Sequence, residues 1–157
     1  MKRLFFVMIG CMMMIGCMMM IACAGSRPDN LGVTNGRLAE CPSSPNCVNS
    51  QATDEDHAIA AFTYEGNRQD AFARLKKTLS SVERMTIVEE KDNYLHVECT
   101  SAIMRYVDDL EFYFQEEKVI QVRSASRLGL SDFSVNRDRV ELLRELFNTI
   151  EESTNAK

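Results

Sequence analysis

The sequence lacks every motif that would assign it a known catalytic mechanism. Its 157 residues contain no Gly-x-Ser-x-Gly nucleophile motif, no glycine-rich phosphate-binding loop and no pair of zinc ligands. It has only two histidines, His57 and His96, and neither has a ligand-like spacing to the cysteines. We therefore expect no metal, no cofactor and no enzymatic class that a short motif can identify.

Basic residues are too few for general nucleic-acid binding. The chain has 18 Lys and Arg against 23 Asp and Glu, a net charge of −5. Lys2 and Arg3 belong to an apolar N-terminal segment, so the remainder carries a net charge of −7. Because phosphate contacts need clustered Lys and Arg, we expect no nucleic-acid partner. An anionic lipid surface would not attract such a domain either.

The first 25 residues have the layout of an export signal. Lys2 and Arg3 precede an apolar run over 4–21, and polar chain begins at Ser26. Eight of the ten methionines fall within the first 20 residues. The run is also about long enough to span a bilayer, which needs roughly 17–25 residues. An uncleaved membrane anchor is therefore the alternative interpretation.

Three cysteines in this segment resemble the end of a bacterial lipoprotein signal. Cys11, Cys17 and Cys23 each follow an aliphatic, a variable and a small residue. Only Cys23 is followed by polar, flexible chain, so we predict a signal peptide over 1–22 and lipidation of Cys23. Two or three acyl chains anchor a protein stably. We expect an exported protein, bound to a bacterial membrane on its periplasmic or cell-surface side.

Residues 23–40 are rich in glycine and polar residues, which predicts a lipidated N-terminus followed by a flexible spacer. Cys41 and Cys47 come next, with two prolines between them. Export to an oxidising compartment favours a disulfide between these two cysteines. Free thiols and a metal site remain the alternatives.

The remaining pattern predicts an α+β domain over 41–152, followed by a disordered tail over 153–157. Helical spacing of apolar residues covers about 67–82, with Asn67 as its cap, and about 136–152, with Asn136 as its cap. The predicted strands are 59–64, 85–90, 94–100, 104–115 and 119–127. The order β-α-β-β-β-β-α suggests an antiparallel sheet of four to five strands with two helices on one face.

The last two predicted strands form a hairpin whose register follows from their apolar faces. The apolar residues that alternate along them are Leu110, Phe112 and Phe114 on the first strand and Ile120 and Val122 on the second. Matching these faces needs a connection of odd length, which residues 116–118 provide. The predicted pairs are Phe112 with Val122, Leu110 with Ser124, and Asp108 with Ser126.

The opposite face of this hairpin carries charged residues of complementary sign. Glu111 lies opposite Arg123, and Asp109 is diagonal to both Arg123 and Arg127. We interpret these residues as ion pairs on an exposed sheet face, each contributing about 0–1 kcal/mol. In the neighbouring strand, His96 is expected on this solvated face, whereas Cys99 is expected to be a buried, inert thiol.

Asp108 falls on the core face, where an ionised carboxylate is costly unless it is hydrogen-bonded. One interpretation is a structural acid that holds the loop at 129–135. The other is a small polar pocket at one end of the sheet. The candidate polar site comprises Asp108, Ser124, Ser126, Asp132, Asn136 and Arg137.

Four segments of the sequence resemble an uncharacterised family of bacterial and plant proteins, catalogued as domain of unknown function 1499. The matching segments are 41–51 (CPSSPNCVNSQ), 106–112 (YVDDLEF), 122–132 (VRSASRLGLSD) and 136–141 (NRDRVE). The resemblance spans roughly residues 38–150 and implies a single domain, but no established activity, substrate or cofactor. One departure is Ser134, where the family often has glycine.

These observations favour a non-catalytic envelope module that binds a small ligand, a lipid or a protein partner. One alternative is a hydrolase-like enzyme that uses Asp108 or Asp132, and another is a structural subunit of an envelope complex. The Asp108-Asp109-x-Glu111 sequence is similar to a metal-binding motif. Strand alternation, however, places Asp108 on the face opposite Asp109 and Glu111, so we predict no shared ion.

Overall fold

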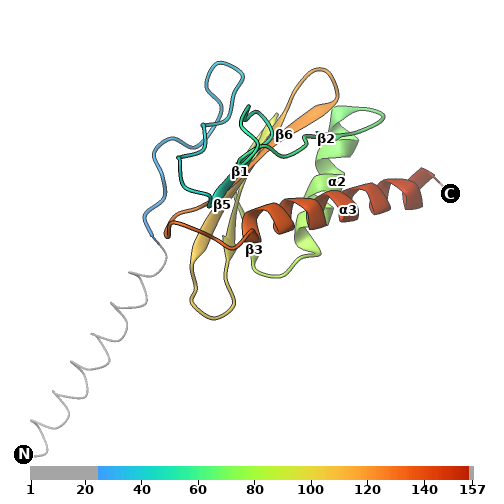
Figure 1. Cartoon of the computed structure of the whole chain (residues 1–157). Helices are drawn as coiled ribbons and strands as arrows, with labels where there is room; N and C mark the ends of the chain where they lie inside the picture. The colour runs from blue at the N-terminus through green and yellow to red at the C-terminus, as the bar shows by residue number, and fades with distance from the viewer. Residues whose placement is uncertain (1–24, 156–157) are drawn as a thin grey trace, which may run out of the picture.

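The fold is an antiparallel sheet with two helices packed on one of its faces (Figure 1). This computed structural model describes residues 25–155, and side chains as far as residue 150. The strands are β1 (Cys47–Asn49), β2 (Phe62–Thr63), β3 (Met85–Lys91), β4 (Tyr94–Thr100), β5 (Val107–Phe114) and β6 (Val119–Ser126). The helices are α2 (Arg68–Ser80) and α3 (Val135–Asn155).

The strand order across the sheet is β1-β6-β5-β4-β3, and β2 also pairs with β6. β1 and β2 lie along the same edge of β6, at opposite ends of that strand. The predicted α+β class, with a strand, a helix, four strands and a helix, is confirmed. The short strand β1, next to Cys47, was not predicted from the periodicity and brings the sheet to six strands.

The register of the β5–β6 hairpin agrees with the prediction. Phe112 pairs with Val122, Leu110 with Ser124, and Asp108 with Ser126. The connection closes with the N–H of Gln115 donating to the carbonyl of Val119 at 2.8 Å. Because the side-chain period of a strand is two, this register decides which side chains face the helices.

The hydrophobic core lies between the sheet and the two helices. Leu75 and Leu79 of α2 and Val140, Leu143 and Phe147 of α3 are at most 2% exposed. They pack on a sheet face formed by side chains such as Leu95, Val97, Leu110, Phe112, Ile120 and Val122. Each fully buried side chain of this size contributes about 1.5–3 kcal/mol of transfer free energy. Helix α2 starts as predicted, since the Asn67 side chain accepts a hydrogen bond from the N–H of Asp70 at 2.9 Å.

Residues 25–40 cover the other face of the sheet, so the interpretation of this segment as a flexible spacer is wrong for the described part. Leu38 is 3% exposed, and its N–H donates to the Gln51 side chain at 2.8 Å. The Gly32 N–H donates to Glu111 Oε1 at 2.8 Å. A composition rich in glycine and polar residues also suits an ordered segment of irregular backbone whose amides satisfy buried polar groups.

Two other predicted boundaries concern the ends of the chain. Helix α3 continues through residues 153–155, which were predicted to be a disordered tail. The predicted signal peptide and Cys23 lie outside the described residues. Within residues 25–155, neither helix combines the length and the apolar character needed to cross a bilayer.

The packing of residues 25–40 predicts a stability effect that a flexible spacer would not have. Replacing Leu38, 3% exposed, by alanine should lower the free energy of unfolding by about 2–5 kcal/mol, because it removes a buried side chain and leaves a cavity. Urea denaturation of the full chain measures this change.

Val33 provides the matched control in the same segment. It is 37% exposed, so Val33→Ala should change the free energy of unfolding by no more than about 0.5 kcal/mol. Equal, small effects of both substitutions would show that the segment does not pack on the sheet.

Candidate functional site

Asn136 is the centre of a buried polar cluster that joins the start of α3 to β6. Its side-chain carbonyl accepts hydrogen bonds from Ser124 Oγ at 2.5 Å and from Arg139 Nη1 at 2.6 Å. Its side-chain amide donates to Ser126 Oγ at 3.0 Å and to Asp132 Oδ2 at 2.7 Å. Asn136 is 0% exposed, and every polar atom of its side chain is paired. Such a fully satisfied network specifies one arrangement of strand, loop and helix.

Asp132, and not Asn136, caps the final helix. Its carboxylate accepts hydrogen bonds from the N–H groups of Ser134 at 3.1 Å and Asn136 at 2.8 Å. These are amide groups at the helix start that have no partner inside the helix. The chain enters α3 through two left-handed residues, Phe133 at φ 53° and Ser134 at φ 68°. Glycine adopts this backbone conformation readily, which accounts for the compatibility of position 134 with glycine.

Asp108 lies beside the cluster, paired with an arginine that the sequence did not single out. Arg139 Nη2 donates to Asp108 Oδ2 at 2.5 Å, and Arg139 Nη1 donates to Ser124 Oγ at 3.0 Å. Asp108 therefore stabilises the position of α3 against the sheet. The loop at 129–135 is held by Asp132 and by Asn46, so the interpretation of Asp108 as the residue that holds this loop is wrong.

Arg137 lies away from the other five residues of the predicted site. Its guanidinium donates to the carbonyl oxygens of Ala58 at 2.8 Å and Asp56 at 3.0 Å. These carbonyls precede β2, so Arg137 connects α3 to that part of the chain. The structure thus brings Asp108, Ser124, Ser126, Asp132 and Asn136 together and separates Arg137 from them.

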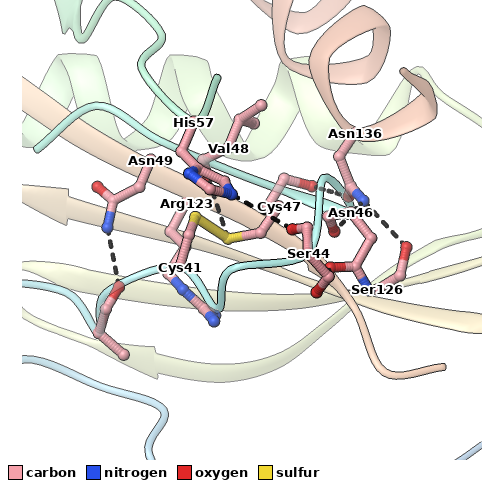
Figure 2. The surroundings of a disulfide bond; sticks show 12 residues. Cys41, Ser44, Asn46, Cys47, Val48, Asn49, His57, Arg123, Ser126 and Asn136 are labelled. Atoms are coloured by element: carbon pink, nitrogen blue, oxygen red, sulfur yellow. Dashed lines mark hydrogen bonds between the residues drawn. A yellow bond between two sulfur atoms is a disulfide. The ribbon is translucent and has the colours of Figure 1, made fainter. Parts of the chain in front are cut away.

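Asn46 is a member of the cluster that the sequence reasoning missed. Its carbonyl accepts from the Asn136 side chain at 3.0 Å and from the Ser126 N–H at 3.0 Å. Its side-chain amide donates to the Gly129 carbonyl at 2.7 Å. Asn46 directly precedes Cys47, and Figure 2 shows it between the disulfide and Asn136. The position of Asn46 directly before Cys47, inside the cysteine motif, is the sequence feature that could have indicated this role.

Cys41 and Cys47 form a disulfide, as predicted from their spacing and the export signal. Cys47 is 3% exposed and begins β1, whose residues pair with β6 (Figure 2). The bond closes a short loop and so restricts the unfolded chain. It holds the end of the segment that covers the sheet close to the strand edge.

A groove opens beside Asp108 and Arg139, with a volume of about 370 Å³. It lies between the start of α3 and the ends of β3 and β4, and its apolar lining consists of Val82, Met85, Cys99, Ala102, Val135 and Leu142. Cys99 is 4% exposed, and burial raises the pKa of its thiol to about 11. The thiol is therefore protonated at neutral pH and a poor nucleophile, in agreement with the inert thiol expected there.

The charged face of the sheet is buried, which corrects its interpretation as a set of surface ion pairs. Asp109 is 1% exposed and receives two hydrogen bonds from Arg127, Nε to Oδ2 at 2.8 Å and Nη2 to Oδ1 at 2.7 Å. His96, also 1% exposed, has its Nε2 at 2.7 Å from the same Oδ1. His96 was expected to be solvated; the cover provided by residues 25–40 excludes water from it.

Glu98 extends this network to the N-terminal segment. Its Oε1 accepts from Arg127 Nη2 at 2.7 Å and from Arg27 Nη2 at 2.6 Å. Burial raises the pKa of Asp109, but the hydrogen bonds from Arg127 and with His96 outweigh this effect and hold that pKa below its ordinary value. The same balance, with Arg127 and Arg27 as partners, lowers the pKa of Glu98. Both groups are therefore charged in the folded protein at neutral pH.

Glu111 anchors a second group of buried polar atoms on this face. It is 0% exposed and accepts from the Gly32 N–H and from the Tyr94 hydroxyl, each at 2.8 Å, and from Arg123 at 3.1 Å. Burial and the neighbouring Glu111 carboxylate raise the pKa of Tyr94, so its hydroxyl remains a donor. The predicted pairing of Glu111 with Arg123 occurs, although in the interior.

The described residues contain no group of three or more His, Cys, Asp or Glu placed to hold a metal ion. Asp108 lies on the opposite face of the sheet from Asp109 and Glu111, as strand alternation requires. The side chains of the candidate site offer hydroxyl, amide, carboxylate and guanidinium groups that mostly bond to one another. Such side chains hold α3 and the preceding loop against β6, and an apolar groove lies beside them.

The chain forms a small α+β domain that is stabilised by two polar networks. One is the Asn136 cluster next to the disulfide-linked motif, and the other is formed by the buried charged residues of the β5–β6 hairpin. A family model matches residues 37–147, more than half of the chain, under the description protein of unknown function (DUF1499). The chain belongs to this family. Comparison with curated proteins and with solved structures gives no match.

The buried network predicts a specific pH dependence of stability. The pKa values of Asp109 and Glu98 are lower in the folded state than in the unfolded state. Their contribution is thus fully present above the ordinary carboxyl pKa values of about 4, and it is lost as the pH falls through their lower folded values. Urea denaturation of the full chain across this range should show the loss.

Arg127→Ala tests the origin of this dependence. Removing the shared partner leaves Asp109 buried without its main counter-charge, which should cost about 3–5 kcal/mol at neutral pH. The loss of stability on acidification should also become smaller, because a protonated Asp109 is then favoured in the fold. Arg84→Ala, in an exposed pair with Glu83, should cost no more than about 1 kcal/mol. An unchanged acid profile in Arg127→Ala would refute this account.

Proposed function

We propose that this protein is an exported lipoprotein, acylated at Cys23, whose domain is a non-catalytic binding module of the bacterial envelope. The Cys41–Cys47 disulfide carries the export part of this proposal, because disulfides persist in oxidising compartments and are rare in the cytosol. The signal-like pattern over residues 1–22 supports it independently. Two or three acyl chains on Cys23 would hold the domain stably at a membrane.

The carboxylates of Asp108 and Asp132 are already hydrogen-bonded within the protein, which supports a binding role over a hydrolytic one. Asp132 accepts from two backbone N–H groups and from the Asn136 side chain. Asp108 is held by the Arg139 guanidinium. A general base has to accept a proton from its substrate or from a bound water. Carboxylates committed to a helix start and to an ion pair are poorly suited to that task.

The groove beside Asp108 is the ligand site that we propose. Its volume of about 370 Å³ falls within the roughly 300–1,000 Å³ range of small-molecule pockets. Its walls are largely apolar, and the Asp108–Arg139 pair lies among its lining residues. A molecule with an acyl or other apolar part and a polar head would match this lining. The apolar part would contact the apolar walls, and the polar head would contact the Asp108–Arg139 pair.

Cys23→Ser tests the anchor. The variant should lose the mass of the acyl chains and move from the membrane fraction to the soluble fraction, since serine provides no thiol for the diacylglycerol. Mass spectrometry of the N-terminal peptide and fractionation of cells measure the two effects.

Cys17→Ser is the matched control and should remain acylated and membrane-bound. Loss of acylation in Cys17→Ser alone would move the lipidation site to Cys17. If neither substitution changes the fractionation and no acyl mass is found, the N-terminus is an uncleaved anchor and the lipoprotein proposal fails.

Leu142→Glu tests the groove. Leu142 lines the groove and is 45% exposed, so the fold should tolerate the change while a charge enters the apolar wall. The full chain, purified in detergent and incubated with a bacterial lipid extract, should retain a small amphipathic molecule detectable by mass spectrometry. Leu142→Glu should abolish that retention.

Val33→Glu introduces the same charge outside the groove, at a residue 37% exposed in the segment over the other face of the sheet, and should leave retention unchanged. Asp108→Asn should fold and weaken retention, because the pair with Arg139 loses its charge. The absence of any retained molecule in the unmodified chain would count against a lipid-binding role.

A further inference from the structure

Two loops at one end of the sheet expose large apolar side chains to solvent. The loop between β4 and β5 carries Ile103, 89% exposed, and the loop before α3 carries Leu130, 83% exposed, and Phe133, 89% exposed. Met104, Tyr106 and Leu128 in the same two loops are 42–54% exposed. Scattered exposed apolar residues are common, but a group rimmed by polar residues marks an interaction surface. We call these six residues the apolar tip.

The two loops lie side by side because they leave adjacent strands at the same end. β5 begins where β6 ends, with Asp108 paired to Ser126, and the Arg127 N–H donates to the Val107 carbonyl at 3.3 Å. In Figure 1 the β4–β5 loop is at the bottom of the domain and the loop before α3 is at its left, both away from the β5–β6 turn. The six residues of the apolar tip therefore lie on two loops at the same end of the sheet.

The described chain begins at this same end. Gly25 packs so closely that a Cβ atom added to it would lie 2.9 Å from the Cβ of Arg127 and 3.2 Å from the Cγ of Leu128. Its φ of 68° also favours glycine. In Figure 1 the blue start of the ribbon meets the loop that precedes α3. The point of attachment of residues 1–24 is thus next to the apolar tip.

We propose that the apolar tip inserts into the phospholipid surface to which the chain is anchored, so that the domain docks on the membrane in one fixed orientation. This inference rests on the proposed acylation of Cys23. Two residues span at most about 7 Å, so an acylated Cys23 brings Gly25 and Leu128 close to the lipid headgroups. Because residues 25–40 pack on the sheet, they cannot act as a flexible spacer that holds the domain away from the membrane.

The chemistry of the tip favours insertion of side chains over attraction by charge. Arg105 and Asp132 are the charged residues of the two loops outside the buried Arg127, and they balance each other. The net charge of −7 beyond Lys2 and Arg3 repels an anionic surface. Phe133 adds a second indication, because a bulky residue in the left-handed region is strained and here also points its ring into water. A lipid surface of zwitterionic headgroups gives that ring an apolar environment.

The absence of tryptophan from the sequence makes the test direct, because one introduced tryptophan reports on one position. The full lipidated chain carrying Phe133→Trp, or separately Ile103→Trp, is reconstituted into phosphatidylcholine vesicles whose acyl chains carry bromine. Interfacial side chains lie about 5–10 Å deep, near the boundary of headgroups and acyl chains, where bromine quenches indole fluorescence. Both residues are 89% exposed, so the substitutions should not disturb the fold.

The control is Glu117→Trp, in the exposed turn between β5 and β6 at the opposite end of the sheet. We expect strong quenching and a blue-shifted emission for Phe133→Trp and Ile103→Trp, and neither effect for Glu117→Trp. Adding phosphatidylglycerol should not increase the quenching, because the tip has no excess of positive charge to attract an anionic surface.

The outcomes separate this inference from the lipoprotein proposal. If the chains co-float with the vesicles and tryptophan at 103 and 133 is not quenched, the anchor stands and the docking inference is overturned. If the emission is blue-shifted without quenching, the tip is covered by protein, such as a second copy, and the inference is also overturned. If the chains carry no acyl group and do not co-float, the lipoprotein proposal fails.

Discussion

The alternation of side chains along β5 and β6 is the constraint on which the rest of the structure depends. One face of this hairpin presents Leu110, Phe112 and Val122, and burying it requires the two helices. The other face presents carboxylates and guanidinium groups whose burial requires a partner with many N–H groups and a matching charge. Residues 25–40 contribute to that partner through the Gly32 N–H, which binds Glu111, and through Arg27, which binds Glu98. The domain therefore has an apolar core on one side of the sheet and an ionic one on the other.

The fold class, the hairpin register and the disulfide could all be predicted, because each follows from a local rule. Period-two alternation and an odd connection determine the pairing of Phe112 with Val122. The short spacing of Cys41 and Cys47 limits their choice of partner once export is inferred. The residues of the polar cluster were found for the same reason, since Asp108, Ser124 and Ser126 had to share the core face.

The remaining features depend on contacts between distant parts of the chain, which no local rule contains. The strand pattern shows that a face is polar, but not whether another segment covers it. Residues 25–40 have the composition of a linker, although the Gly32 N–H binds the buried carboxylate of Glu111. Arg139 and Asn46 were missed because their role depends on where α3 and the disulfide loop meet the sheet. Arg137 directly follows Asn136 in the sequence, yet its guanidinium binds the Ala58 carbonyl in a different part of the molecule.

The path of residues 25–40 also gives the domain a mechanical character. The described chain begins at Gly25, and the first contacts that resist a pull on this end are its packing against Leu128 and the Arg27–Glu98 ion pair. A force directed along the N-terminus would peel this segment from the sheet and admit water to Asp109 and His96. The disulfide at Cys41 would stop the peeling before it reached the strands. A domain of this kind, pulled from its N-terminal end, would yield to tension in two stages, first exposing its ionic face and only later its apolar core.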